Sequence, residues 1–236
     1  MTPLIERIRA GHAIEVAPAA HFSMGGIRIG PGGATTVPGL YACGEAAGGL
    51  HGGNRLSGNA GAQILVQAKA AGQNAARLVR TAGPGGAPRN TAELLDRLHA
   101  PRHQTGGPVP AEVKAALTGL AERALSPVRG GETLDAALAD LRALAADALP
   151  RLSLRTAERR WNRDWFDALD CAAAVPVLES ALLAARARRR SIGAHYRRDG
   201  AGEPDGVLSH GIIRRTGATL DHCFVPVAFP LAEPVP

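Results

Sequence analysis

Aromatic residues are scarce in this sequence: they make up 3% of its 236 residues, although hydrophobic residues of all kinds reach 45%. Alanine, leucine and valine must therefore do most of the packing. A mean hydropathy of -0.03 leaves enough apolar surface for a sizeable core and argues against a chain that is disordered throughout.

Cysteine is equally rare. The three cysteines, Cys43, Cys171 and Cys223, include no C-x-x-C pair, which argues against a disulfide scaffold and against a zinc site. We expect the thiols to be buried and reduced, in a cytoplasmic protein. The eight histidines are scattered without metal-ligand spacing, so no metal site is predicted.

Long apolar runs are missing as well. No uninterrupted run of about 18 apolar residues occurs, so the sequence predicts no membrane-spanning helix. The N-terminal segment, MTPLIERIRAGHAIEV, carries charges where a signal peptide has its apolar stretch, and no secretion signal is predicted.

Positive charge is in excess, with 27 Lys and Arg against 21 Asp and Glu, a formal net charge of +6. The excess is local, since two arginine groups lie in segments with a helical pattern. We expect solvated helix faces, or faces that meet an anionic partner. The two groups are Arg155, Arg159, Arg160 and Arg163, and Arg186, Arg188, Arg189 and Arg190.

Composition changes along the chain predict four parts. Residues 1–80 are rich in glycine with short apolar runs, as in an α/β fold, whereas residues 81–110 collect glycine and proline like a linker with one short helix at most. Residues 111–198 have a helical pattern, and residues 199–236 form an extended tail.

Three apolar stripes at three- and four-residue spacing predict a bundle of three antiparallel helices. The stripes are Val113, Ala116, Leu117 and Leu120; Leu134, Ala137, Leu138, Leu141 and Leu144; and Val177, Leu178, Ala181, Leu182 and Ala185. In the tail, the expected strands are Ile212–Ile213 and Cys223–Val227.

The segment with the clearest chemistry follows a Val-Pro-Gly turn. Leu40–Cys43 is expected to be a short buried strand that ends at Gly44 and Glu45, and a glycine-dense loop follows at residues 48–61. A helix is predicted from about Ala60 to Arg80. Its expected inner face is Ile64, Leu65, Ala68, Ala71, Ala75 and Leu78.

A strand, a carboxylate, a glycine-rich loop and a helix N-terminus together favour a cofactor-binding edge. A carboxylate at a strand end can accept hydroxyl groups of a ribose type. Glycines let the backbone approach a flat ring closely, and the free N–H groups of a helix N-terminus face an anion.

Three runs carry a family resemblance: His21–Ile27 (HFSMGGI), Val37–Glu45 (VPGLYACGE) and His51–Asn59 (HGGNRLSGN). They resemble consecutive motifs of the FAD-bearing flavoprotein subunits of succinate dehydrogenase and fumarate reductase, with L-aspartate oxidase as a close relative. Residues 162–170 and 193–197 are similar to the helical C-terminal domain of the same family.

The resemblance implies an α/β fragment of a Rossmann-like FAD-binding domain, with residues 1–20 at the end of a capping domain, followed by an all-α three-helix bundle and a short extended tail. The G-x-G-x-x-G motif that binds the FAD pyrophosphate does not occur in the sequence. The chain is therefore expected to correspond to a C-terminal half that needs an N-terminal half for FAD binding and turnover.

The resemblance also assigns roles to residues. His21 and Arg55 are expected to bind the carboxylates of a dicarboxylate substrate, and Glu45 beside Gly44 to bind the ribityl or ribose hydroxyls. His51 is expected to be structural, and no catalytic residue is assigned, because the proton-shuttling arginine of the family lies in the absent cap. The expected contacts to the pyrimidine edge of the flavin are Asn59, Ala60 and Gly61.

Two departures from the family pattern leave alternatives open. Ala60–Gln63 replaces a Ser-Leu-Leu-acid run, and Arg190–Ile192 stands where Glu-Ser-Arg is usual. A non-catalytic remnant and an L-aspartate oxidase-like fragment are alternative interpretations. A basic helical module that binds nucleic acid is a remote one, because stacking residues are scarce.

Partners follow from the same resemblance. The expected partner is an N-terminal flavoprotein half or an equivalent chain, an iron–sulfur subunit is a further candidate, and no nucleic acid is expected. Location at the inner face of a membrane through partner subunits is the alternative to a purely cytoplasmic protein.

Overall fold

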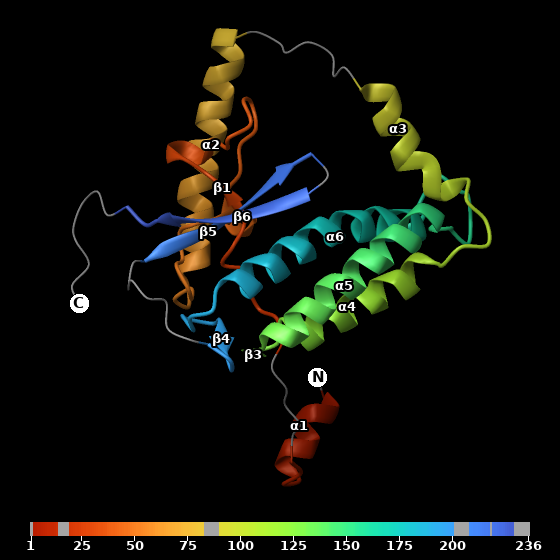
Figure 1. Ribbon diagram of the computed structural model, residues 1–236, viewed down its shortest axis with the longest axis horizontal. Helices are drawn as coiled ribbons and strands as arrows, with labels where there is room; N and C mark the ends of the chain where they lie inside the picture. The colour runs from red at the N-terminus through yellow and green to blue at the C-terminus, as the bar shows by residue number, and fades with distance from the viewer. Residues whose placement is uncertain (1, 14–18, 83–89, 201–207, 218, 229–236) are drawn as a thin grey trace. The chain divides into compact units, whose positions relative to one another are not determined.

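The computed structural model describes residues 2–13, 19–82, 90–200, 208–217 and 219–228. The chain divides into two compact units, one made of Met1–His51 and Arg55–Leu78, the other of Gly52–Asn54 and Val79–Pro236. Figure 1 shows the helices and strands of both units along the chain.

The first unit has little regular structure apart from its helices. It contains α1 (Thr2–Arg9), β1 (Ile27–Arg28), the 3-10 turns η1 (Pro31–Gly33) and η2 (Gly44–Ala46), β2 (Ala47–Gly48) and most of α2 (Asn59–Ala82). β1 and β2 pair in parallel, Ile27 with Ala47 and Arg28 with Gly48. Gly26 and Gly48 make this approach possible, because a Cβ on Gly26 would lie 2.5 Å from the carbonyl oxygen of Ala46.

The expected buried strand at Leu40–Cys43 is not found. Tyr41 forms a single bridge with Ala34, and Leu40 is 48% exposed. A strand buried in a parallel sheet needs neighbours on both sides, and the part of the chain that the structure describes forms only two-stranded pairs.

The helix predicted at Ala60–Arg80 is present as α2, but its predicted inner face is only partly covered. Ala71 is buried, whereas Leu65 is 76% exposed and Ile64 is 47% exposed. Ala68 and Leu78 are exposed too. The periodicity predicted which face of the helix is apolar. Within the part of the chain that the structure describes, only the middle of that face is covered by other residues.

The second unit contains the predicted helical domain. Its elements are α3 (Thr91–His99), η3 (Ala100–Arg102), α4 (Pro110–Ala124), β3 (Val128–Arg129), α5 (Gly131–Asp147), η4 (Leu149–Arg151), α6 (Arg163–Ala187), β4 (Tyr196–Arg197), β5 (Ser209–Thr216) and β6 (Thr219–Pro226). Helices α4, α5 and α6 pack against one another (Figure 1). The short helix expected between residues 81 and 110 is α3; residues 83–89 lie outside the described part.

Leucine dominates the core of the helical domain, as the shortage of aromatics predicts. Leu134, Leu141 and Leu182 are fully buried, and each contributes about 1.5–3 kcal/mol by leaving water. Two members of the predicted stripes, Ala116 and Val177, are exposed instead. By length and composition α6 could cross a membrane, but the core helix of a bundle meets the same criteria, and Ala168, Cys171, Leu178, Leu182 and Ala185 of α6 lie in this core.

The tail is more regular than expected, since β5 and β6 form an antiparallel hairpin with Ile212 opposite Cys223. The cysteine prediction was correct for Cys171 only: Cys223 is exposed and Cys43 is partly exposed. Cys223 lies on a two-stranded sheet, which leaves one of its faces open to solvent.

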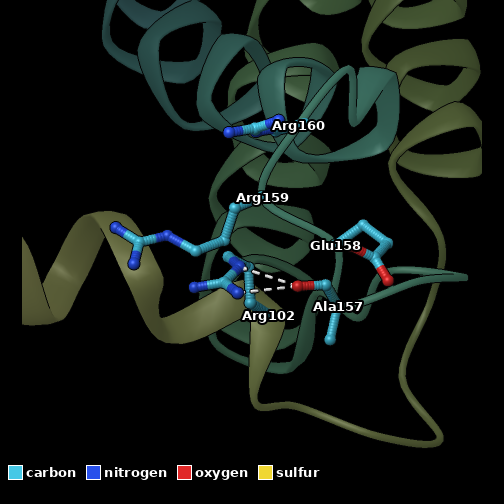
Figure 2. Close-up of a pocket in the computed structure, with 5 residues that line it drawn as sticks. All are labelled: Arg102, Ala157, Glu158, Arg159 and Arg160. Atoms are coloured by element: carbon cyan, nitrogen blue, oxygen red, sulfur yellow. Dashed lines mark hydrogen bonds between the residues drawn. The ribbon is translucent and has the colours of Figure 1, made fainter.

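Of the first arginine group only Arg163 lies on a helix, which corrects the sequence interpretation. Residues 152–162 form an irregular loop, and α6 begins only at Arg163. Asn162 ends this loop by accepting a hydrogen bond from the Trp165 N–H (3.1 Å), as an N-cap does. Arg102 donates two hydrogen bonds to the Ala157 carbonyl, at 3.2 and 2.7 Å (Figure 2).

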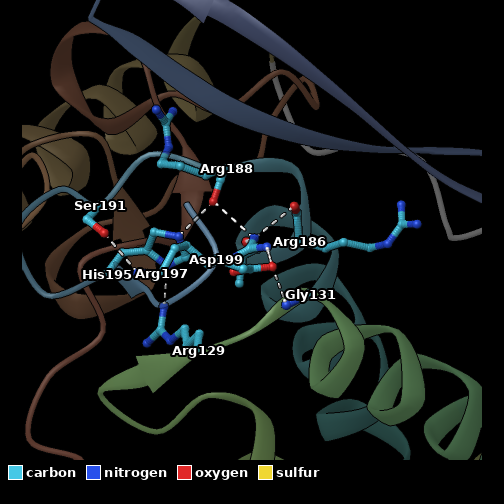
Figure 3. Close-up of polar contacts among 9 residues, drawn as sticks. Arg129, Gly131, Arg186, Arg188, Ser191, His195, Arg197 and Asp199 are labelled. Carbon is cyan, nitrogen blue, oxygen red and sulfur yellow. Dashed lines mark hydrogen bonds and ion pairs between the residues drawn. The ribbon is translucent and has the colours of Figure 1, made fainter. Parts of the chain in front are cut away.

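Of the second arginine group only Arg186 lies within α6, and the backbone of the group contacts a buried guanidinium. The Arg197 side chain is 3% exposed and donates to the carbonyls of Ala185, Arg186 and Arg188, where α6 ends. It also forms a double ion pair with Asp199, which accepts from the Gly131 N–H at 2.8 Å (Figure 3). This network joins the end of α6 to the start of α5.

His195 lies in the same network as a neutral ring. Its Nε2 is 2.8 Å from the Arg188 carbonyl, which only accepts, and its Nδ1 is 2.8 Å from Arg129 Nη1, which only donates. Burial lowers the pKa of His195, and the charges of Arg129, Arg197 and Arg188 lower it further against the opposing hydrogen bond to the Arg188 carbonyl.

Replacing Arg197 tests the network. Arg197→Leu leaves three carbonyls at the end of α6 without their donor, and we expect the free energy of unfolding to fall by about 3 kcal/mol. Arg198→Leu, at an exposed neighbour, should change it by less than about 0.5 kcal/mol. Urea denaturation measures both, and equal losses would mean that the guanidinium network contributes nothing special.

Stability should also fall with acidification because of His195. Its folded-state pKa lies below the ordinary value of 6.5, so the unfolded chain binds more protons between these two values and the free energy of unfolding falls as the pH drops below 6.5. Asp199, whose pKa is held well below its usual range by Arg197, acts only at more acidic pH. NMR titration of the His195 ring measures its pKa directly; a value at or above the ordinary 6.5 would contradict this prediction.

Candidate functional site

Gly44 and Glu45 are held from two sides in the first unit. Gln67 Oε1 accepts from the Gly44 N–H at 3.3 Å, and Gln63 Nε2 donates to the Gly44 carbonyl at 3.1 Å and to Gln67 Oε1 at 3.0 Å. Gly44 is buried with a left-handed φ of 68°, which suits glycine. The helix therefore holds both backbone groups of the residue before the expected cofactor acid.

Glu45 itself is exposed and anchored at one oxygen. Its Oε1 accepts a hydrogen bond from the Ser23 N–H at 2.8 Å. The other oxygen has no hydrogen bond within the described residues, so it can accept one from a ligand hydroxyl. The anchor orients the carboxylate without neutralising its charge.

His51 belongs to the same group of contacts. Its Nε2 lies 2.5 Å from Gln63 Oε1, which can only accept, so the proton is on Nε2. The ring also packs edge-on against Phe22, with centroids 5.4 Å apart. These contacts suit the structural role expected for His51.

The structure brings His21 and Arg55 together from 34 residues apart. Arg55 Nη2 lies 3.1 Å from His21 Nε2, and Nη1 donates to the Leu56 carbonyl. The guanidinium stacks on the Phe22 ring, 4.3 Å from its centroid. Arg55 Nε is buried and has no hydrogen-bond partner among the residues that the structure describes, a condition that an acceptor oxygen would correct.

The N-terminus of α2 lies exposed. Asn59 and Gly61 are exposed and Ala60 is half-buried, and Gly58 before them has a φ of 85°. The first N–H groups of a helix have no partner within it, so this end can stabilise a negative charge. These three residues can face an anionic edge of a ligand.

The donors and acceptors present fit the flavin part of FAD. Within the described residues of the first unit they offer a carboxylate with a free oxygen, a helix N-terminus, and glycines at 49 and 58 where a Cβ atom would meet nothing within 4 Å. The sequence contains no G-x-G-x-x-G for the pyrophosphate. The described residues contain no group of three or more possible metal ligands.

Sequence reasoning missed Ser23, Phe22 and Gln67 as supports of the site and noted Gln63 only as a departure from a family pattern. Gln63 and Gln67 are four residues apart and so lie on one helix face. That spacing, directly after a glycine-rich loop, was the available signal.

Two family models match the chain. Residues 5–60 match the FAD binding domain, and residues 114–228 match the fumarate reductase flavoprotein C-terminal domain. The fumarate reductase flavoprotein subunit of Mycobacterium tuberculosis is 31% identical over 225 residues, covering 91% of this chain and 38% of that protein. The L-aspartate oxidase of Streptomyces coelicolor is 35% identical over 208 residues, covering 86% and 34%.

Solved structures agree with these matches. Escherichia coli quinol fumarate reductase superposes with a TM-score of 0.86 at 28% identity, over 94% of this chain and 39% of that one. A quinol-fumarate reductase with menaquinol gives a TM-score of 0.82 at 27% identity, over 92% and 39%. The chain thus spans well under half the length of each of these four proteins.

Proposed function

Because the chain belongs to the flavoprotein family of the fumarate reductases and succinate dehydrogenases, whose cofactor is FAD, we propose that it forms the C-terminal part of an FAD-dependent oxidoreductase acting on a dicarboxylate. The observation that carries the proposal is the pairing of His21 with Arg55, whose buried Nε lacks an acceptor. Bound FAD would supply the hydride chemistry.

Arg55 is suited to hold one substrate carboxylate. A guanidinium binds a carboxylate with two parallel hydrogen bonds, and its stacking on Phe22 fixes the plane of the fork. His21, in contact with Nη2, is placed to bind the same substrate and orient it. Correct orientation of a reacting carbon is worth several kcal/mol of a reaction barrier.

Glu45 and the start of α2 are suited to the cofactor. The free oxygen of Glu45 would accept flavin hydroxyls, beside the backbone of Gly44. The N-terminus of α2, at Asn59, Ala60 and Gly61, would stabilise negative charge on a reduced flavin by about 1 kcal/mol.

The proposed protein needs a second polypeptide part that carries the nucleotide-binding motif. Leu56, Leu65 and Val66 are 73%, 76% and 70% exposed, which gives such a part an apolar surface in the first unit. An iron–sulfur subunit, and through it the inner face of a membrane, complete the proposed setting.

L-aspartate oxidation is the second candidate function. It is favoured by the 35% identity to the Streptomyces coelicolor enzyme, which exceeds the 31% identity to the mycobacterial subunit. L-aspartate is itself a dicarboxylate, so the same pair of His21 and Arg55 would serve.

Glu45→Ala should weaken FAD binding when the nucleotide-binding part is present. A hydrogen bond to a charged group is worth about 1.5–3 kcal/mol, or roughly ten- to a hundredfold in affinity. Glu45→Gln keeps an acceptor for the Ser23 N–H, and its FAD affinity should fall less than that of Glu45→Ala. Flavin fluorescence titration measures both, with Glu122→Ala as the control; unchanged affinity in Glu45→Ala would remove Glu45 from the cofactor site.

Arg55→Lys keeps the positive charge but removes the planar guanidinium, which can donate two parallel hydrogen bonds to a carboxylate. We expect kcat/KM for succinate, fumarate or L-aspartate to fall at least about tenfold, because misorientation disturbs the reacting geometry. In Arg55→Ala, kcat/KM should fall further while the FAD content stays the same. In the control Arg80→Lys, kcat/KM should not change. Normal turnover by Arg55→Ala would contradict the substrate role, and loss of FAD would place Arg55 in the cofactor site.

A further inference from the structure

The loop before α6 presents three consecutive side chains outward. Arg159 and Arg160 are exposed, and Trp161 is 97% exposed. In a chain with only two tryptophans, one stands almost entirely in water beside two positive charges. None of these three residues has a role in the proposed site, which lies in the first unit.

The same loop is held firmly from its inner side. Asn162 is 4% exposed, and its Nδ2 donates to the carbonyls of Thr156 (2.8 Å) and Glu158 (2.9 Å). Arg102 holds the Ala157 carbonyl and stacks near the Trp165 ring, 5.1 Å from its centroid. The backbone is thus fixed by its own carbonyls while the side chains at 159–161 point elsewhere.

This loop carries positive charge that is not neutralised by ion pairs. Arg155 pairs with Asp164, and Arg163 pairs with Asp167, so half of the arginine group is neutralised. Within the residues that the structure describes, Arg159 and Arg160 have neither a hydrogen bond nor an ion pair. Figure 2 shows both side chains apart from Glu158, with the Arg159 side chain extended.

Trp161 has a backbone conformation that disfavours its own side chain. Its φ of 55° is left-handed, and Trp161 is the only described residue other than glycine with a positive φ. The conformation is costly for a bulky residue, and burial of the indole does not offset the cost, since the ring is in water. Strain of this kind often marks a functional site.

The surface beside these residues is hollowed. Arg102, Ala157, Glu158, Arg159 and Arg160 line a depression of about 410 Å³. It is large enough for a few side chains of another polypeptide. Two unpaired guanidinium groups at such a depression attract carboxylates, which they can bind in a bidentate manner.

We propose that residues 156–162 form a docking surface for an acidic polypeptide segment, whose carboxylates pair with Arg159 and Arg160 and whose apolar side chain covers Trp161. Tryptophan and arginine are the residues most enriched among binding hot spots of protein interfaces. A nucleic acid fits less well, because sequence-independent binding of a single strand uses several stacking aromatics and this loop offers one, Trp161.

The binding test uses the whole chain and two probes: a synthetic peptide of alternating glutamate and leucine, and oligothymidylate of matched charge. Quenching of tryptophan fluorescence at physiological salt reports binding. The Trp161→Phe variant shows how much of the fluorescence signal comes from Trp161 and how much from Trp165. We expect the peptide to bind, and the double variant Arg159→Glu, Arg160→Glu to bind it at least about tenfold more weakly.

The matched control is Arg214→Glu, Arg215→Glu, which reverses the charge of two adjacent exposed arginines on β5. It should leave peptide affinity within about twofold of the original chain. Equal losses in both double variants would reduce the effect to net charge and overturn the proposal. Tighter binding of oligothymidylate than of the peptide, or no peptide binding at all, would overturn it too.

Trp161→Gly separates function from folding. Glycine adopts a left-handed φ without strain, so the midpoint temperature of thermal unfolding should rise. Loss of the indole should lower the affinity for the peptide. A higher midpoint with unchanged peptide affinity would show that the indole takes no part in docking. A lower midpoint would show that the ring has a structural role, which also contradicts the proposal.

Discussion

The candidate site depends on the hydrogen bonds by which two glutamine side chains hold the backbone of Gly44. Gln63 and Gln67 satisfy the carbonyl and the N–H of a buried glycine with a left-handed φ, and Gln63 also fixes the proton of His51. Glu45 follows directly, and its anchor at Ser23 lies two residues after His21. A small set of hydrogen bonds therefore places Glu45, the carboxylate proposed to meet the cofactor.

Part of this site could be predicted from the sequence. The motif runs located His21, Glu45 and Arg55, and the structure brings His21 and Arg55 to 3.1 Å. The start and end of α2 were predicted within two residues, because the apolar periodicity of a long helix is a strong signal. The supports at Ser23, Phe22 and Gln67 were not predicted, since each contact depends on how distant segments fold back.

Burial was the least predictable property. The apolar stripe of α2 resembles those of α4 and α5, yet Leu65 and Ile64 are exposed while Leu134 and Leu141 are fully buried. Periodicity states which face is apolar but not whether this chain covers it. The arginine groups show the same limit: Arg197 is buried as a cap on α6, and Arg159 and Arg160, in an equally basic stretch, are exposed.

We propose that this chain contributes the flavin and carboxylate contacts and that another polypeptide part contributes the pyrophosphate contacts. A titration of FAD fluorescence tests this division most directly, with the purified chain alone and then with a polypeptide that carries G-x-G-x-x-G from a fumarate reductase relative. We expect no tight FAD binding by the chain alone and stoichiometric FAD binding in the mixture. Stoichiometric, tight FAD binding by the chain alone would contradict this proposal.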